Sequence, residues 1–237
     1  MVNEKKSIMD SGIKFDRSNW GDVFSASLGK VMIQQIRCND LIIKDRDWSA
    51  DLSKGILSFG SDDFSVQFIG SESNSTGTWL WGWENVNNFP ESILKVANEV
   101  GSIGDAKGLK PLTTAEIELT DVYNGYTFSA VACALSSDRM CYYRGPHGGG
   151  AIFMAFSPSS EEVFAPATAH EFGDTVMTCI QAFTVDHRIF IESFLDQNGT
   201  GFEWDRNAII ARFDNDLKIE FEPVGNTQRI KSISFVR

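Results

Sequence analysis

Three tryptophans at alternate positions are the feature that most constrains how this chain folds. They lie in residues 77–85, whose sequence is Gly-Thr-Trp-Leu-Trp-Gly-Trp-Glu-Asn. Successive side chains of a strand point to opposite faces, so a strand places Trp79, Trp81 and Trp83 on one face. A helix spreads the rings around its circumference and keeps Gly82 in its interior, which costs about 1 kcal/mol. The stretch is therefore predicted to be a strand.

The tryptophan-bearing side of this strand admits two interpretations. It is either a platform on which a flat ligand or a sugar stacks, or the inner face of a sheet. In the second case, the helices predicted at residues 24–36 and 93–100 cover it, and the large apolar area favours this arrangement. For the platform, polar residues near the ends of the strand are candidates for orienting a ligand: Ser71, Ser73, Thr78 and Asn85.

The charge balance excludes several classes of partner. The chain carries 21 Lys and Arg against 32 Asp and Glu, a formal net charge of -11. Nucleic-acid binding needs clustered basic residues that neutralise phosphates, so we expect neither DNA nor RNA as a partner. An anionic membrane surface is excluded for the same reason. A basic protein or peptide fits this balance.

The sequence also predicts a compartment. No run approaches the ~18 apolar residues of a membrane span, and residues 1–19 lack the apolar core of a signal peptide. The cysteines are dispersed and form no Cys-x-x-Cys pair: Cys38, Cys133, Cys141 and Cys179. In a chain without an export signal, such cysteines are typically reduced and buried. We therefore expect a cytoplasmic protein.

The order of predicted elements indicates an α+β fold, with antiparallel sheet meanders packed against helices. Helices are expected at residues 20–40, 90–101, 121–136, 166–184 and 187–197. Strands are expected at residues 55–60, 64–71, 77–85, 139–144, 151–156, 202–204, 208–213, 217–221 and 229–236. Residues 121–136 begin with a strand-like alternation but end in an Ala-rich segment with helical spacing, and the helix is favoured.

The sequence indicates domain boundaries less clearly than it indicates helices and strands. Residues 1–18 are polar and without a sustained period, so we expect a loose tail. Residues 19–237 are predicted to form a single α+β unit. A linker at residues 105–111 offers a boundary between two possible lobes, 19–108 and 109–237.

A glycine-rich segment, residues 144–150, connects two predicted strands. A P-loop requires Gly-Lys-Ser/Thr before a helix, and a dinucleotide fingerprint requires Gly-x-Gly-x-x-Gly at a strand-to-helix turn. Neither is present, so the segment is predicted to be a hairpin turn. Tyr142, Tyr143, Arg144 and His147 are candidates for the rim of a pocket beside it.

No catalytic or metal-binding pattern stands out. His170-Glu171 begins like a zinc-protease helix, but Asp174 occupies the position of the second histidine. The three histidines are isolated, and no Gly-x-Ser-x-Gly elbow is present. We expect no metal and no cofactor, and an enzyme is the less favoured class.

Two motifs resemble a bacterial family of unknown function. Residues 69–85 run Ile-Gly-Ser-Glu-Ser and later Thr-Trp-Leu-Trp-Gly-Trp-Glu-Asn, with Pro90 shortly after. The family is marked by a Gly-Ser-x-Ser turn and a Trp-x-Trp-x-Trp-x-Asn strand, and residues 142–146 are similar to its second signature. Glu84 departs from it, because a small residue is usual there. The resemblance spans residue 47 to the glycine-rich hairpin and implies a soluble, intracellular domain without an established activity.

Two functions are expected from these observations. The first is a non-catalytic cytosolic protein that binds a small molecule near the tryptophan strand. Its candidate ligand-binding residues are Trp79, Trp81, Trp83, Asn85, Ser71, Ser73, Tyr143, Arg144 and His147. The alternative is an acidic protein of the immunity or antitoxin kind that binds a basic protein partner through charge complementarity. An enzyme whose site assembles from distant residues is a third possibility, and a homodimer is left open.

Overall fold

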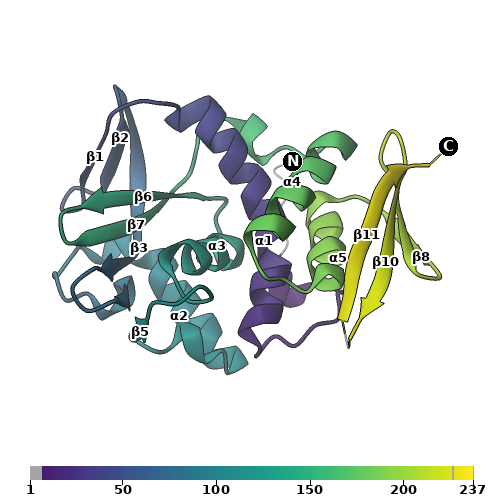
Figure 1. Ribbon diagram of the computed structural model, residues 1–237. Coiled ribbons are helices and arrows are strands. Elements are labelled where there is room, and N and C mark those ends of the chain that lie inside the picture. Colours follow the sequence, from purple (N-terminus) through teal and green to yellow (C-terminus); the bar gives the residue numbers. More distant parts are fainter. Residues whose placement is uncertain (1–6, 226, 237) are drawn as a thin grey trace. The chain divides into compact units, whose positions relative to one another are not determined.

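The computed structural model describes residues 7–225 and 227–236, and the chain divides into two compact units (Figure 1). Among the described residues, unit 1 is Gln34–Phe164, and unit 2 joins residues 7–33 to the part of the chain from Ala165 onward. Helix α1 (Trp20–Cys38) begins in unit 2 and ends in unit 1. The predicted α+β class is confirmed, because helices and antiparallel sheets occur in both units.

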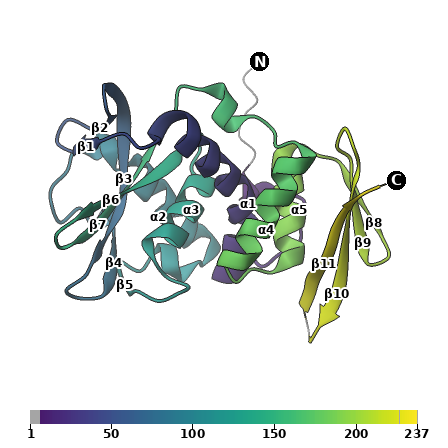
Figure 2. The same ribbon diagram turned by 45° about the horizontal axis from the view of Figure 1, so that its top comes forward.

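Unit 1 combines two helices with a seven-stranded sheet. The helices are α2 (Lys95–Lys107) and α3 (Gly125–Leu135). The strands are β1 (Trp48–Asp51), β2 (Ile56–Phe59), β3 (Asp62–Ser73), β4 (Thr78–Trp81), β5 (Glu116–Glu118), β6 (Cys141–His147) and β7 (Gly150–Phe156). Both helices lie against one face of the sheet (Figures 1 and 2).

The long strand β3 organises this sheet. Its first half pairs with β2 and its second half with β4, while its other edge pairs with β7, which also pairs with β6. Strand β5 pairs with β4 and ends the order β1-β2-β3-β4-β5. The register against β7 shifts between Phe68 and Gly70, so Phe68 and Ile69 are both buried.

Helix α3 lies in residues 121–136, the segment whose sequence shows both a strand-like and a helix-like pattern. Its N-cap is Asn124, whose Oδ1 accepts hydrogen bonds from the backbone N–H groups of Tyr126 and Thr127, both at 3.1 Å. Thr127 Oγ1 in turn accepts from Asn124 N at 3.2 Å. This reciprocal capping satisfies N–H groups that a helix start otherwise leaves unpaired. The predicted helix is confirmed.

The expected loose tail differs from the structure. Residues 1–6 lie outside the described residues, but Ile8–Asp10 forms a 3-10 helix in which Ile8 and Met9 are buried. Arg17 Nε donates to the backbone oxygen of Met9 at 2.7 Å. The burial of Ile8 and Met9 and the hydrogen bond from Arg17 hold this segment in place. Because so few residues are involved, the sequence shows no periodic hydrophobic pattern there.

The expected lobes also differ from the structure. Residues 19–108 and 109–237 do not match the two units, because unit 1 continues through the proposed boundary to Phe164. Unit 2 joins residues 7–33 to the part of the chain from Ala165 onward, which come from opposite ends of the sequence. Because these two segments are far apart in the sequence, no single linker marks the boundary of unit 2.

Unit 2 contains the first part of α1 together with two further helices and a four-stranded antiparallel sheet. The helices are α4 (Ala169–Ala182) and α5 (His187–Asn198). The strands, in the spatial order β11-β10-β9-β8, are β8 (Phe202–Asp205), β9 (Ala208–Ala211), β10 (Leu217–Val224) and β11 (Thr227–Phe235). The helix predicted at residues 187–197 is present as α5, and Asp186 caps it, since Asp186 Oδ1 accepts from Ile189 N at 2.9 Å.

Helix packing in unit 2 depends on a close approach at α1. A Cβ atom added at Gly29 would lie 2.5 Å from the ring of Phe194 in α5, so a larger residue does not fit there. On the sheet, alternate residues of β10 are buried: Leu217, Ile219 and Phe221. Period-two alternation of this kind is what the sequence predicts for a half-buried strand.

All four cysteines are free and buried, as expected. Burial raises the pKa of Cys179 to about 12. A hydrogen bond with Cys38, together with burial, raises the pKa of Cys141. A thiol whose pKa is raised stays protonated and is a poor nucleophile or metal ligand.

Two features are absent from the part of the chain that the structure describes. None of its helices combines the length and apolar character of a membrane span. No three or more of its His, Cys, Asp and Glu side chains come together in a way that would hold a metal ion.

Candidate functional site

Strand β4 presents different residues to the two faces of the unit 1 sheet. Trp79 and Trp81 point to the side that α3 covers, and both are 0% exposed. The ring of Phe128 in α3 stacks on Trp79 and meets Trp81 edge-on, with ring centroids 5.2 Å apart in both cases. These two tryptophans therefore belong to the core. We call this side, defined by Gly70, Glu72, Trp79 and Trp81, the tryptophan face.

The Gly-Ser-x-Ser motif, a turn in the family that this chain resembles, lies here within β3, which continues past the predicted strand end at residue 71 to Ser73, and it supports the tryptophan face. A Cβ atom at Gly70 would lie 2.4 Å from the ring of Trp79 and 2.5 Å from the oxygen of Leu80, so only glycine fits. Glu72 Oε1 accepts from Gly125 N at 2.7 Å, at the start of α3. Negative charge is favourable at a helix N-terminus, so Glu72 fastens α3 over the rings.

The tryptophan strand ends earlier than predicted, at Trp81. Gly82–Glu84 forms a 3-10 helix, and Trp83 is half-buried and out of line with the other two rings. Asn85 follows with a φ of 46°, a conformation that Asn tolerates better than most residues. Its Nδ2 donates to Phe89 O at 3.0 Å and its Oδ1 accepts from Phe89 N at 2.7 Å. Asn85 therefore closes a loop.

The opposite side of the same strands carries hydroxyl and carboxylate groups. Cross-strand pairing aligns two rows: Ser71, Leu80 and Glu116 in one, and Ser73, Thr78 and Glu118 in the next. Thr78 Oγ1 donates to Glu116 Oε1 at 2.8 Å. Glu116 and Glu118 are exposed, and the other four are half-buried. We call these six residues the carboxylate face.

A small hollow with about 10 Å³ of accessible space lies beside Ser71 and Leu80 on the carboxylate face. Its apolar lining includes Phe68, Leu80 and Val86, and Val86 is 64% exposed. Because Leu80 pairs with Glu116, the hollow adjoins the carboxylates. Its accessible space corresponds to about one water molecule, so the hollow accommodates neither a free metabolite nor a side chain, and its exposed rim at Val86 is the part that a partner can contact.

The four residues expected to rim a pocket near the glycine-rich hairpin are not gathered by the structure, and Tyr142 is buried. Tyr143 is half-buried, its ring 4.9 Å from Phe59 and 5.4 Å from Trp48 between centroids, and burial raises its pKa. Arg144 lies on the opposite face of β6, because successive side chains alternate. His147 is exposed, and its Nδ1 accepts from a backbone N–H of the hairpin turn at 3.2 Å.

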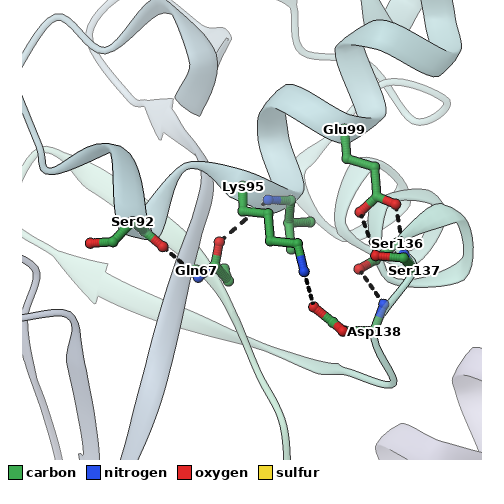
Figure 3. A network of polar contacts seen from close by, with 8 residues as sticks. Gln67, Ser92, Lys95, Glu99, Ser136, Ser137 and Asp138 are labelled. Carbon is green, nitrogen blue, oxygen red and sulfur yellow. Dashed lines mark hydrogen bonds and ion pairs between the residues drawn. The ribbon is translucent and has the colours of Figure 1, made fainter.

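A second polar cluster joins β3 to α2 (Figure 3). Gln67 Oε1 accepts from Val96 N in the first turn of α2, at 3.3 Å, and Gln67 Nε2 donates to Ser92 O at 2.9 Å. The N-cap residue Leu94 provides no side-chain cap, so Gln67 takes that role from the sheet.

The same cluster joins α2 to the segment after α3 (Figure 3). Lys95 Nζ donates to Asp138 Oδ2 at 2.7 Å, and Glu99 Oε1 accepts from Ser137 N at 2.9 Å. Because these groups are used by one another, the cluster fastens α2 within unit 1 and does not offer a binding site.

Most of the acidic excess lies in unit 1. Residues 34–164 contain nine Lys or Arg against seventeen Asp or Glu, a net charge of -8. Unit 2 contains eleven against fourteen, a net charge of -3. The potential around unit 1 therefore attracts cations more strongly, and the exposed carboxylates of β5 contribute to it.

Sequence reasoning found part of the carboxylate face and missed the rest. Ser71, Ser73 and Thr78 were candidates, and the structure places them side by side. Glu116 and Glu118 were not, because no strand was predicted over their segment. The available signal was the alternation Glu-Ile-Glu, which is typical of a strand with one solvated face.

Comparison with known proteins gives a family. A family model, described as a family of unknown function (DUF6882), matches residues 21–158. No curated protein and no solved structure matches the chain. The matched residues include both faces of the unit 1 sheet and make up more than half of the 237 residues. The chain therefore belongs to DUF6882, a family of unknown function.

Proposed function

We propose that unit 1 is a protein-binding module that recognises a basic partner through the carboxylate face. The observation that carries this proposal is the position of Glu116 and Glu118, which are exposed, lie two residues apart on one strand and adjoin the hollow. Basic groups of a partner meet the carboxylates, and one apolar side chain of the partner packs on exposed Val86 at the rim of the hollow. An apolar contact beside complementary charge is a common arrangement in protein interfaces.

The surrounding charge supports the same proposal. Unit 1 has a net charge of -8, which speeds encounter with a basic protein and repels acidic ones. Acidic immunity and antitoxin proteins bind basic partners by this kind of complementarity, and we propose that class as the best match. The four buried thiols suit a reducing compartment, so the cytoplasm is the proposed location.

Binding of a small molecule by the tryptophan strand has weaker support. Trp79 and Trp81 are 0% exposed, so neither offers a ring face to a ligand. Asn85 already uses both polar atoms of its side chain on Phe89. The hollow that Trp81 helps to line is far smaller than an ordinary ligand site.

Charge reversal on the carboxylate face tests the proposal. The probe is a short lysine-rich peptide, with a glutamate-rich peptide of the same length for comparison, titrated calorimetrically at low salt. The lysine-rich peptide should bind and the acidic one should not. The double variant Glu116→Lys with Glu118→Lys should raise the Kd by about tenfold or more, which corresponds to ~1.4 kcal/mol.

The matched control is Asp45→Lys with Asp47→Lys. Both residues are exposed, lie in unit 1 and precede β1, at the opposite end of the strand order from β5, so this variant makes the same change in net charge away from the carboxylate face. Its Kd should change by less than about threefold, through the general field alone. An equal loss in both double variants, or no binding of the lysine-rich peptide by the unaltered chain, would refute the proposal.

A further inference from the structure

The outer edge of β5 is open. In the antiparallel ladder with β4, Trp81 N donates to Ala115 O at 3.1 Å and Leu119 N donates to Gly77 O at 2.8 Å. These bonds mark the residues of β5 that face β4 as the odd-numbered ones, including Ile117. The backbone N–H and C=O of Glu116 and Glu118 therefore point away from β4. Among residues 7–225 and 227–236, no strand pairs with that edge.

The side chains of β5 determine which strand fits the open edge. Glu116 and Glu118 extend over the carboxylate face, whereas Ile117 lies on the tryptophan face, opposite Trp79. In an added strand, residues directly across from Glu116 and Glu118 have side chains about 5 Å away on the same face. The residue between them contacts Ile117, which is half-buried.

We propose that β5 captures an extended segment of the partner by antiparallel strand addition, and that the segment has the pattern basic–apolar–basic. This inference rests on the proposed function and specifies its partner. The two basic side chains pair with Glu116 and Glu118, and the apolar one covers Ile117. Antiparallel addition continues the sheet, in which every pairing is antiparallel. In complexes formed by strand addition, main-chain hydrogen bonds supply affinity and side chains supply specificity.

The same charges protect the edge from self-association. A second copy of β5 pairing on this edge places glutamates across from glutamates, which is destabilising. Natural proteins commonly block open edges with charged residues in this way. The edge is thus closed to another copy of the chain and open to a basic strand.

Two peptides of identical composition separate the strand-addition mode from simple charge attraction. One alternates lysine and valine, and the other groups the lysines before the valines. Calorimetric titration of the unaltered chain should give a Kd about tenfold lower for the alternating peptide, because only that peptide places lysines across from both glutamates. Equal affinities would overturn strand addition while leaving the proposed function intact. If neither peptide binds, both proposals fail.

Methylation of peptide nitrogens tests the main-chain bonds without altering the protein. In antiparallel pairing with Glu116 and Glu118, the N–H groups of the lysines face β5 and those of the valines face away. N-methylation of the lysines should therefore raise the Kd by about tenfold or more, whereas N-methylation of the valines should change it by less than about threefold. Similar effects of both methylations contradict the proposed register.

A change on β5 provides the complementary test. Glu118→Pro removes a charge and the outward N–H, whereas Glu118→Gln removes the charge alone. Because that N–H does not face β4, proline leaves the existing ladder bonds in place. The Kd for the alternating peptide should be about fivefold or more higher for the proline variant than for the glutamine variant. Equal Kd values for the two variants, with native circular dichroism, would overturn the strand-addition mode.

Discussion

The two faces of the unit 1 sheet are built from the same three strands, yet they differ in almost every property. On the tryptophan face, Trp79 and Trp81 are 0% exposed and α3 covers them. On the carboxylate face, Glu116 and Glu118 are exposed beside a hollow. One alternating sequence produces both faces, because neighbouring residues of a strand point in opposite directions.

This difference shows that the tryptophan motif and the candidate binding site lie on opposite faces of the sheet. The aromatic residues that attract attention in the sequence build the fold, and so do Gly70 and Asn85. The less conspicuous residues between and beside them remain available to a partner. Substitutions on the tryptophan face should therefore change stability, and substitutions on the carboxylate face should change binding.

The largest expected effect is that of Trp79→Ala. The ring is buried against Phe128, Trp81 and Phe153, so its removal leaves a cavity in the core. The free energy of unfolding of unit 1 should fall by about 3–5 kcal/mol, measured by urea denaturation. Leu80→Ala, on the other face of the same strand and half-buried, is the control. An equal loss for both variants would remove the distinction between the faces.

Gly70→Ala should have the next largest effect. The added Cβ overlaps the ring of Trp79 and the oxygen of Leu80, and neither is the end of a flexible chain. Overpacking of this kind costs about 1–3 kcal/mol. Gly148→Ala is the control, because nothing lies within 4 Å of a Cβ at that position. Thermal unfolding that is equally unaffected in both variants would show that β3 does not press against the rings.

The two buried indoles should respond differently to replacement by phenylalanine. Trp81 Nε1 donates to Pro111 O at 2.9 Å, whereas Trp79 Nε1 has no hydrogen-bond partner among the described residues. Trp81→Phe leaves a carbonyl unpaired, and Trp79→Phe removes an unpaired donor. Trp81→Phe should therefore be the more destabilising by about 1 kcal/mol in urea denaturation. The opposite order would contradict the hydrogen bonding of the tryptophan face.

Asn85→Ala should weaken the loop beside the hollow by a similar amount. The substitution removes both hydrogen bonds to Phe89 and places alanine at a positive φ. A loss of about 1–2 kcal/mol is expected from denaturation, with exposed Asn87→Ala as the control. Equal stabilities for the two variants would show that Asn85 does not hold the loop.

The smallest effect on stability should come from the carboxylate face. Glu116→Gln with Glu118→Gln removes two exposed charges and leaves the side-chain shapes almost unchanged. The free energy of unfolding should stay within about 0.5 kcal/mol of the original value, while binding of the lysine-rich peptide weakens. A large loss of stability would assign these residues to the fold instead.

The sequence predicts the local elements well where the signal is local. The helices predicted at residues 121–136 and 187–197 are present as α3 and α5, the alternation of β4 is present, and the α+β class is correct. Trp83 was misplaced because the strand gives way to a 3-10 helix at Gly82, a change that no period-two pattern reveals.

Features set by long-range pairing were not predictable. Strand β3 pairs with β7, about eighty residues later in the chain, and β5 becomes an edge only through the order of the sheet. Nothing in three residues of Glu-Ile-Glu indicates which strand lies beside them. The division into units follows contacts between residues 7–33 and the C-terminal part, which a linear pattern does not record.

Amide hydrogen exchange along β4 and β5, with and without the alternating lysine–valine peptide, tests the division of the two faces most directly. In the free chain, the amide of Ile117, which faces β4, should exchange slowly, and those of Glu116 and Glu118 should exchange fast. The peptide should slow exchange at Glu116 and Glu118 by about tenfold or more and leave Trp79 and Trp81 unchanged. Unchanged exchange at both glutamates in the presence of saturating peptide would contradict this account.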